Sequence, residues 1–325
     1  MKVPRLELAR LPTPLVPLER LSAMLDGPTI WLKRDDMTDT SASGNKLRKL
    51  EFSVARALDE GATMLITCGG VQSNHCRATA IVAASLGLGC HLILRGSETS
   101  PADGNLLLDR LAGANISWVN HTQYEELDAI YEDLEAQYRQ AGEVPFSIPV
   151  GASDETGLWG YIEAARELRD DFERLDIDPG YIVSATGSGG TLGGLIIGRE
   201  RYGLDATIVG FNVCDDEQWF QQKIRGDLDH WKARYQETID VGKLSINIID
   251  GYVGPGYGRA EPGVFKTIKW VARTEGVFLD PVYTGKAFDA LLQELEKGRF
   301  RDTRDIVFLH TGGIFGLFPM KEQFG

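Results

Sequence analysis

The chain has 325 residues, of which 43% are apolar and 25% are charged, values typical of soluble globular proteins and sufficient for one large or two smaller α/β domains. Asp and Glu outnumber Lys and Arg by 47 to 34, and the resulting net charge of −13 argues against nucleic acids and anionic membranes as partners. No stretch approaches the roughly 18 consecutive apolar residues of a membrane helix, and the N-terminal residues contain no apolar run typical of a secretory signal.

Short apolar runs alternate with amphipathic stretches along the chain. The runs predict strands at residues 30–33, 64–68, 91–94, 116–119, 181–185, 208–213, 246–249 and 306–309. Helices are predicted between most of them, at residues 46–58, 74–86, 124–140 and 157–168. This alternation is typical of parallel sheets with right-handed crossovers, so we expect an α/β protein.

Three of the predicted strands lead into glycine-rich loops, namely Cys68–His75, Thr186–Gly194 and His310–Gly316. In parallel sheets, ligands bind beyond the carboxyl ends of the strands. We therefore expect these loops, together with the turn after Val213, to line one shared cleft.

The cysteines and histidines give no indication of a metal site. Four cysteines are too few and too scattered for a disulfide framework or a zinc ribbon. The five histidines show no ligand spacing such as H-E-x-x-H. The sequence therefore predicts no metal site, and unpaired cysteines are typical of a reducing, cytoplasmic compartment.

The loop from Thr186 to Gly194 predicts a phosphate site. A glycine-rich turn from a strand into a helix exposes backbone N–H groups, and the helix dipole adds positive potential there. Ser188 and Thr191 add two hydroxyl donors. The alternative is a tight turn whose glycines serve only packing, and the two hydroxyls among so many glycines argue against it.

A dinucleotide site is the second functional interpretation of this loop. Asp215 lies 22 positions after Gly193, where a ribose-binding acid would follow the next strand. The glycines depart from G-x-G-x-x-G, because Leu192 stands where the third glycine belongs. An NAD-linked oxidoreductase is therefore a second, less favoured hypothesis.

A lysine at a predicted helix start is a candidate for covalent chemistry. Asn45 is predicted to be the N-cap, so that Lys46 lies near the positive end of the helix dipole. This position favours the neutral amine that Schiff-base chemistry requires. The spacing alone does not distinguish Lys46 from a solvated surface lysine.

Six sequence blocks, in a fixed order, carry a family resemblance. They are S-G-N-K-L-R-K-L-E at 43–51, G-V-Q-S-N-H-C-R at 70–77, G-S-G-G-T at 187–191, G-P-G-Y-G at 254–258, D-P-V-Y-T-G-K at 280–286 and H-T-G-G at 310–313. Together they resemble the D-cysteine desulfhydrase and 1-aminocyclopropane-1-carboxylate (ACC) deaminase family, to which L-cysteate sulfo-lyases are similar. The resemblance runs from about Leu11 to about Phe318.

The resemblance implies the tryptophan-synthase-β-like fold (fold type II), with two open parallel-sheet α/β domains around a cleft for pyridoxal 5′-phosphate (PLP). We expect a large PLP-binding domain of residues 1–47 and 157–325 and a small inserted domain of residues 48–156. The resemblance also implies a homodimer and a small amino acid as substrate.

The family's roles transfer to matching positions of this sequence. Lys46 would hold the aldehyde of PLP and move the Cα proton of the substrate, and Asn74 would bond the phenolic oxygen of the ring. The phosphate would be held by Gly187, Ser188, Gly189, Gly190 and Thr191.

Four further side chains are expected to meet the substrate. Ser73 and His75 would bind its carboxylate at a helix N-terminus, where an anion is favoured. Tyr257 and Tyr283 would face the reacting carbons, with Tyr283 as a candidate proton shuttle for the leaving group. Without the resemblance, an N-cap serine and buried core tyrosines would be the ordinary interpretation.

Thr284 is the position most informative about the substrate. ACC deaminases that resemble this block have Glu after D-P-V-Y, beside the pyridine nitrogen of PLP. Thr284, with Thr311 as a second hydroxyl, would leave that nitrogen neutral and weaken the electron sink. His75 also stands where ACC deaminases have Gln. We therefore expect desulfhydrase-like β-elimination of a good leaving group, giving pyruvate and ammonia, with sulfide from cysteine.

Two departures from the family pattern leave alternatives open. Ser43 stands where relatives usually carry Gly, and Ala78 stands where they often carry Gln. Both positions border the site, so the orientation of the substrate is open, as is a protein that binds PLP or an amino acid without turning it over. Within the family, L-cysteate sulfo-lyase and ACC deaminase remain the alternatives.

Overall fold

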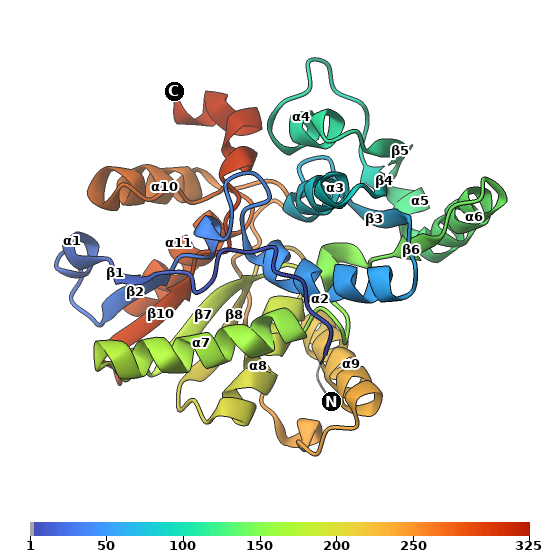
Figure 1. The fold of residues 1–325 in the computed structure, drawn as a ribbon. Coiled ribbons are helices and arrows are strands. Elements are labelled where there is room, and N and C mark those ends of the chain that lie inside the picture. Colours follow the sequence, from blue (N-terminus) through green and yellow to red (C-terminus); the bar gives the residue numbers. More distant parts are fainter. Residues whose placement is uncertain (1–2) are drawn as a thin grey trace.

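Two sheets form the framework of the chain in a computed structural model that describes residues 3–325 (Figure 1). Six strands pair in the order β1-β2-β10-β7-β8-β9, and four pair in the order β5-β4-β3-β6. All neighbouring strands are parallel except β1 and β2, which are antiparallel. The predicted α/β fold with two open parallel sheets is confirmed.

The larger sheet consists of β1 (Leu15–Pro17), β2 (Thr29–Lys33), β10 (Asp305–Leu309), β7 (Tyr181–Thr186), β8 (Thr207–Asn212) and β9 (Asn247–Ile249). The smaller sheet consists of β5 (Asn115–Val119), β4 (Gly89–Arg95), β3 (Met64–Gly70) and β6 (Pro145–Ser147). The helices are α1 (Glu19–Ser22), α2 (Asn45–Asp59), α3 (Asn74–Leu86), α4 (Gly104–Leu111), α5 (His121–Glu125), α6 (Leu127–Gln140), α7 (Trp159–Leu175), α8 (Gly190–Tyr202), α9 (Glu217–Tyr235), α10 (Pro262–Glu275) and α11 (Thr284–Glu296). Short 3₁₀ turns are η1 (Asp35–Met37), η2 (Val150–Ala152), η3 (Val241–Lys243) and η4 (Ile314–Phe324).

All eight predicted strands are present, each within two residues of its predicted limits. The sequence reading missed β1 and β6, which have three residues each and contain Pro17 and Pro145. Proline weakens a strand prediction because it cannot donate to a sheet, and both strands lie at sheet edges, where proline is tolerated.

Two predicted helices differ in their limits. The helix expected at 124–140 is divided into α5 and α6, with Glu126 between them. The helix expected at 157–168 continues as α7 to Leu175, where Asp176 ends it with a left-handed φ of 53°. Among residues 3–325, no helix is long and apolar enough to cross a membrane.

Alternate residues of the central strands face separate cores. Ile182 of β7 packs with α7, α8 and α9, whereas its neighbour Val183 packs with α10 and α11. In the smaller sheet, Leu65 packs with α2 and α3, and Ile66 packs with α6. These strands read as continuous apolar runs because both of their faces are buried.

Helix α2 belongs to both cores. Phe52 packs with the core around α7, whereas Leu50 packs with the core of the smaller sheet. The strands of the smaller sheet come from residues 64–147, between β2 and β7 of the larger one. The expected domain limits at 47/48 and 156/157 stay a prediction, because α2 crosses the first of them and packs on both sides.

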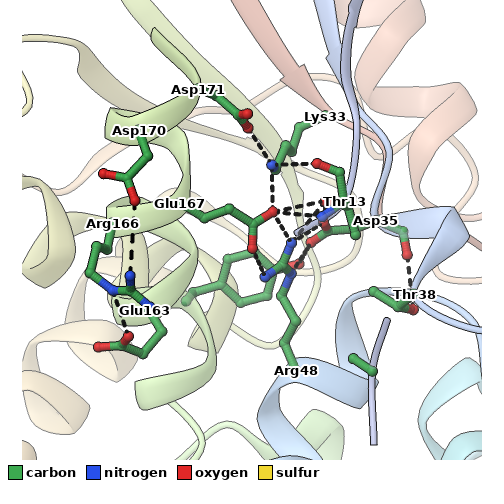
Figure 2. Close-up of polar contacts among 12 residues, drawn as sticks. Thr13, Lys33, Asp35, Thr38, Arg48, Glu163, Arg166, Glu167, Asp170 and Asp171 are labelled. Atoms are coloured by element: carbon green, nitrogen blue, oxygen red, sulfur yellow. Dashed lines mark hydrogen bonds and ion pairs between the residues drawn. The ribbon is translucent and has the colours of Figure 1, made fainter. Parts of the chain in front are cut away.

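A buried cluster of charges joins β2, α2 and α7 (Figure 2). Arg48 on α2 donates to both oxygens of Asp35, at 2.9 and 2.8 Å, and to both oxygens of Glu167 on α7, at 2.9 and 3.0 Å. Lys33 donates to Asp171 at 2.6 Å and also pairs with Glu167. Burial opposes ionisation of Glu167, but the hydrogen bonds and charges of Arg48 and Lys33 outweigh it and lower its pKa to about 2.

The two helices approach closely beside this cluster. A Cβ atom at Gly160 of α7 would lie only 2.6 Å from the backbone carbonyl oxygen of Arg48. The Arg48 guanidinium is only 2% exposed, and its partner Asp35 is fully buried. The first turn of α2 is therefore held against α7 by paired charges that are shielded from water.

We expect the substitution Arg48→Met to lower the free energy of unfolding by about 3–5 kcal/mol, because it leaves the fully buried Asp35 carboxylate without its counter-ion and removes one of the two cations paired with Glu167. Arg56→Met on the same helix is the matched control. Arg56 forms a partly exposed pair with Glu60, so we expect its loss to cost less than about 1 kcal/mol. Urea denaturation measures both values, and equal losses would show that the buried cluster does not anchor α2.

Candidate active site

A cavity of about 860 Å³ opens at the carboxyl ends of strands from both sheets. Its walls come from the ends of β3, β4 and β7, the segment after β8, and the N-termini of α2 and α3. Eleven of the thirteen predicted site residues line it: Lys46, Ser73, Asn74, His75, Gly187, Ser188, Gly189, Thr191, Tyr257, Tyr283 and Thr311. Residues from all six sequence blocks thus meet in one cavity.

The structure does not bring Gly190 or Thr284 to the cavity wall. The N–H group of Gly190 instead donates to Ser153 Oγ at 3.2 Å. Thr284 is fully buried, and its hydroxyl donates to the Asp280 carboxylate at 2.7 Å and accepts the Asp280 N–H at 2.8 Å. Of the two threonines expected near a ring nitrogen, Thr311 is the one that lines the cavity.

Lys46 lies in the first turn of α2. The prediction of Asn45 as N-cap is wrong, because α2 begins at Asn45 and Gly44 is the N-cap with φ of 111°. A side chain at Gly44 would be excluded twice, since positive φ disfavours it and a Cβ atom would lie 2.7 Å from the Thr311 carbonyl oxygen. Asn45 Nδ2 instead donates to Thr191 Oγ1 at 3.0 Å, and Asn45 Oδ1 accepts from Lys46 Nζ at 3.0 Å.

The surroundings of Lys46 favour its neutral form. Burial and the nearby charge of Arg77 lower the pKa of Lys46 to about 8, although the Asp280 carboxylate opposes the shift. About a tenth of this amine is therefore unprotonated at pH 7, far more than for an ordinary lysine. Its nitrogen lies 5.7 Å from the centre of the Tyr283 ring.

Two tyrosines form a hydrogen-bonded pair on the cavity wall. The hydroxyl oxygens of Tyr257 and Tyr283 are 2.6 Å apart. Burial raises the pKa of Tyr257 to about 12 and that of Tyr283 well above the usual tyrosine value, so both stay protonated at neutral pH. Each ring lies against a glycine: a Cβ atom at Gly70 would be 3.1 Å from the Tyr257 ring, and one at Gly187 would be 2.9 Å from the Tyr283 ring.

The turn from β7 into α8 forms a cup of N–H and hydroxyl groups. Gly189 is the N-cap of α8, and its φ of 84° requires glycine. The Ser188 hydroxyl lies 2.8 Å from the Ser153 hydroxyl, which also accepts from the buried Lys49 amine at 3.2 Å. Thr191 Oγ1 accepts a hydrogen bond from α2, so its own proton remains available for a ligand. Such a helix N-terminus favours a phosphate group.

Ser153 and Lys49, which contribute to this cup, were not predicted from the sequence. Ser153 lies in the irregular segment after η2, far along the chain from the glycine-rich loop, and no pattern marked it. Lys49 lies three residues after Lys46 on α2. Burial and the charge of Lys46 lower its pKa well below the usual lysine value.

The N-terminus of α3 contributes a serine, an asparagine and a histidine. Ser73 is the N-cap and accepts the Cys76 N–H at 3.2 Å. Asn74 Oδ1 accepts from Arg77 at 3.3 Å and from Asn105 at 3.1 Å, which leaves the Asn74 Nδ2 group to donate into the cavity. The orientation of this amide is therefore set by two donors behind it.

His75 is buried and neutral. Burial and the charges of Lys46 and Lys49 lower the pKa of its ring. Nε2 lies 2.8 Å from Thr67 Oγ1, which donates its own proton to the Ile148 carbonyl, so Nε2 carries the ring proton. Nδ1 is then an acceptor and has no partner within residues 3–325.

Arg95 also lines the cavity, although the sequence analysis did not predict it as a site residue. It is the last residue of β4, at the carboxyl edge where ligands are expected, but no glycine-rich loop follows it. The strand-end rule applied to the predicted strand 91–94 would have pointed to this position.

Comparisons with known proteins agree on one family. A family model described as "Pyridoxal-phosphate dependent enzyme" matches residues 6–312. The chain is 40% identical to the mitochondrial bifunctional D-cysteine desulfhydrase/1-aminocyclopropane-1-carboxylate deaminase of Arabidopsis thaliana, over 97% of this chain and 80% of that protein. It is also 40% identical to the D-cysteine desulfhydrase of Klebsiella pneumoniae (strain 342), over 98% of this chain and 96% of that one. A solved structure described as an ACC deaminase homologue superposes with a TM-score of 0.91 at 34% identity, covering 99% of this chain and 96% of the other.

Proposed function

The chain belongs to the pyridoxal-phosphate-dependent enzyme family, and we propose that it is a D-cysteine desulfhydrase-like lyase that eliminates the β-substituent of a small amino acid to give pyruvate and ammonia. The same family includes the alternatives of L-cysteate sulfo-lyase and ACC deaminase. The family match favours PLP over the NAD-linked hypothesis that Asp215 had raised.

The polar groups of the cavity fit PLP. Lys46 offers an amine with a pKa of about 8 for the aldehyde. The N-terminus of α8, with the hydroxyls of Ser188 and Thr191, offers donors for the phosphate, and the Asn74 amide offers a donor for the phenolic oxygen.

The protein's own groups divide the proton transfers between them. When bound, PLP supplies an electron sink for the negative charge that develops at the substrate Cα. Lys46 takes the Cα proton, because part of its amine is neutral near pH 7. Tyr283 donates to the departing group, because burial keeps its hydroxyl protonated and Tyr257 can return a proton across 2.6 Å.

The N-terminus of α3 is the proposed site for the substrate carboxylate. Ser73 accepts the Cys76 N–H and so keeps its own hydroxyl proton for the substrate. The helix dipole adds positive potential at this point. Because the His75 ring turns its proton toward Thr67, we propose that His75 contributes its backbone N–H rather than its side chain.

The charge of the cavity wall is the observation that carries the choice of reaction. Asp215 is the only acidic residue among those in 3–325 that line the cavity, and it is exposed on the loop after β8. The resemblance implies that Thr311, which lines the cavity, lies near the ring nitrogen, so we propose a hydroxyl there instead of a carboxylate. A hydroxyl does not hold the nitrogen protonated, so the electron sink is weak and the reaction depends on a good leaving group. Thiolate meets that requirement better than the ring carbon of ACC.

A homodimer and a cytoplasmic location complete the proposal. The homodimer rests on the family resemblance. The location is supported by the four cysteines, all of which are free; three of them, Cys68, Cys76 and Cys90, are buried.

Replacing both Ser188 and Thr191 with Ala should weaken PLP binding by about 2–4 kcal/mol, the sum of two hydrogen bonds to a charged phosphate. Equilibrium dialysis with detection of the cofactor absorbance measures the change. Ser184→Ala removes a buried hydroxyl of β7 that does not line the cavity, so this control should bind PLP as the unmodified protein does. If the double variant binds PLP as tightly as this control, the phosphate lies elsewhere.

The substrate prediction follows from the hydroxyl-lined wall. D-cysteine and β-chloro-D-alanine should yield pyruvate, whereas ACC should yield little or no 2-oxobutanoate. The measurement is kcat/KM for ACC, D-cysteine, L-cysteine and L-cysteate on the unmodified enzyme. A kcat/KM for ACC above those of the other three would contradict the proposed function.

A further inference from the structure

Asn105, in the first turn of α4, is a fully buried asparagine whose side chain contacts the N-terminus of α3. Its Oδ1 accepts from Arg77 Nη1 at 2.8 Å. Its Nδ2 donates to the Gln72 carbonyl at 2.8 Å and to Asn74 Oδ1 at 3.1 Å. Asn105 lies outside the six sequence blocks and does not line the cavity, whereas Asn74 does. Asn105 can therefore act on the site through Asn74.

The chemistry of its partners permits one orientation of the Asn105 amide. A guanidinium can only donate, so the atom that faces Arg77 is the amide oxygen. A backbone carbonyl can only accept, so the atom that faces the Gln72 carbonyl is the amide nitrogen. Because this nitrogen also donates to Asn74, the Asn74 atom that it meets is the oxygen. The nitrogen of Asn74 is then left to donate into the cavity.

The partners of Asn105 are themselves held in place. Arg77 is fully buried and donates to the Ser43 carbonyl at 2.6 Å. Its central guanidinium carbon lies 4.8 Å from the centre of the Phe315 ring. On the other side, the Gln72 side chain accepts the backbone N–H of Asn105 at 2.8 Å. The Asn105 side chain is thus fixed between α3 and the loop that precedes it.

We propose that Asn105 is a positioning residue for the cofactor, which orients the Asn74 amide so that its N–H group, rather than its oxygen, meets the phenolic oxygen of PLP. This proposal rests on the proposed function, in which Asn74 binds that oxygen. A phenolic oxygen that carries negative charge is attracted by a donor and repelled by an acceptor. Without Asn105, the Asn74 amide would keep only its bond from Arg77, which at 3.3 Å is the longer of the two.

A double-variant cycle, with PLP affinity measured by equilibrium dialysis, tests the proposal. Asn74→Ala should weaken PLP binding by about 10- to 100-fold, the loss of one hydrogen bond to a charged oxygen. Asn105→Leu, which keeps the size but has no polar side-chain atom, should weaken it by about 3- to 10-fold, since Arg77 still contacts the Asn74 amide. In the Asn74→Ala background, Asn105→Leu should change the affinity by less than about twofold, because no amide is left to orient.

Asn105→Asp reverses the polarity that Asn74 meets and carries the same test if Asn105→Leu does not fold. The new carboxylate keeps an acceptor for Arg77, but it faces Asn74 with an acceptor as well. The Asn74 amide should then turn its oxygen toward the cavity, so PLP binding should weaken by more than in Asn105→Leu. The Asn74→Ala background shows how much of this loss comes from the added charge alone.

Asn247→Leu is the matched control. Asn247 is a partly buried asparagine of β9 that donates to the Ile208 carbonyl at 3.0 Å and does not line the cavity. Its loss should change PLP affinity by less than about twofold.

The absorbance of the bound cofactor gives a second readout, which a purely structural role would not change. A donor to the phenolic oxygen favours its unprotonated form, so Asn105→Leu should raise the pH midpoint of the absorbance change by about 0.5–1 unit. Asn247→Leu should leave this midpoint unchanged.

Three results would overturn the proposal: equal weakening by Asn105→Leu with and without the Asn74 amide, no weakening in either background, or unchanged PLP binding in Asn74→Ala. If no amino acid yields pyruvate but PLP affinity still depends on Asn105 through Asn74, the proposed function fails and this proposal stands. If D-cysteine yields pyruvate and the two substitutions act additively on PLP affinity, this proposal fails and the proposed function stands.

Discussion

The buried ion pairs of Arg48 set the position of the helix on which the site depends. Arg48 holds α2 to Asp35 and to Glu167, and Lys46 lies two residues before it, in the same turn of helix. Paired charges are costly to bury, and they are tolerated here because each carboxylate receives several hydrogen bonds. An arginine is suited to this place, since its planar donors reach two carboxylates at once.

The same turn of α2 connects the reactive amine to the phosphate cup. Asn45 donates to Thr191 at the start of α8 and accepts from Lys46, so the amine and the cup share one intermediate side chain. The glycine at position 44 permits this arrangement, because the chain passes against the backbone of Thr311 there. Lys46 and the cup are therefore held in a fixed position relative to each other.

Much of the fold and of the candidate site could be predicted from local sequence. Apolar runs locate the central strands, and the motif blocks identify the residues that line the cavity. The predictions that failed concern residues whose positions depend on contacts between distant segments. Gly44 rather than Asn45 caps α2 because of a close approach by the segment at Thr311. Thr284 is turned away from the cavity because Asp280 takes its hydroxyl. The strand-end rule could have placed Arg95 at the cavity, but not the Tyr124 and Tyr257 rings beside its guanidinium, because these come from two other segments.

The central claim is that Lys46, rather than one of two other buried lysines, carries the cofactor. Lys49 and Lys286 are also buried, and burial lowers the pKa of both amines. Neither of them lines the cavity, however, whereas Lys46 does. Lys49 donates to Ser153, and Lys286 donates to the backbone carbonyl of Val253. Reduction of the purified holoenzyme with borohydride, followed by peptide mapping, tests the claim directly. The pyridoxyl group should be found on Lys46; finding it on Lys49 or Lys286, or finding none, would contradict the account.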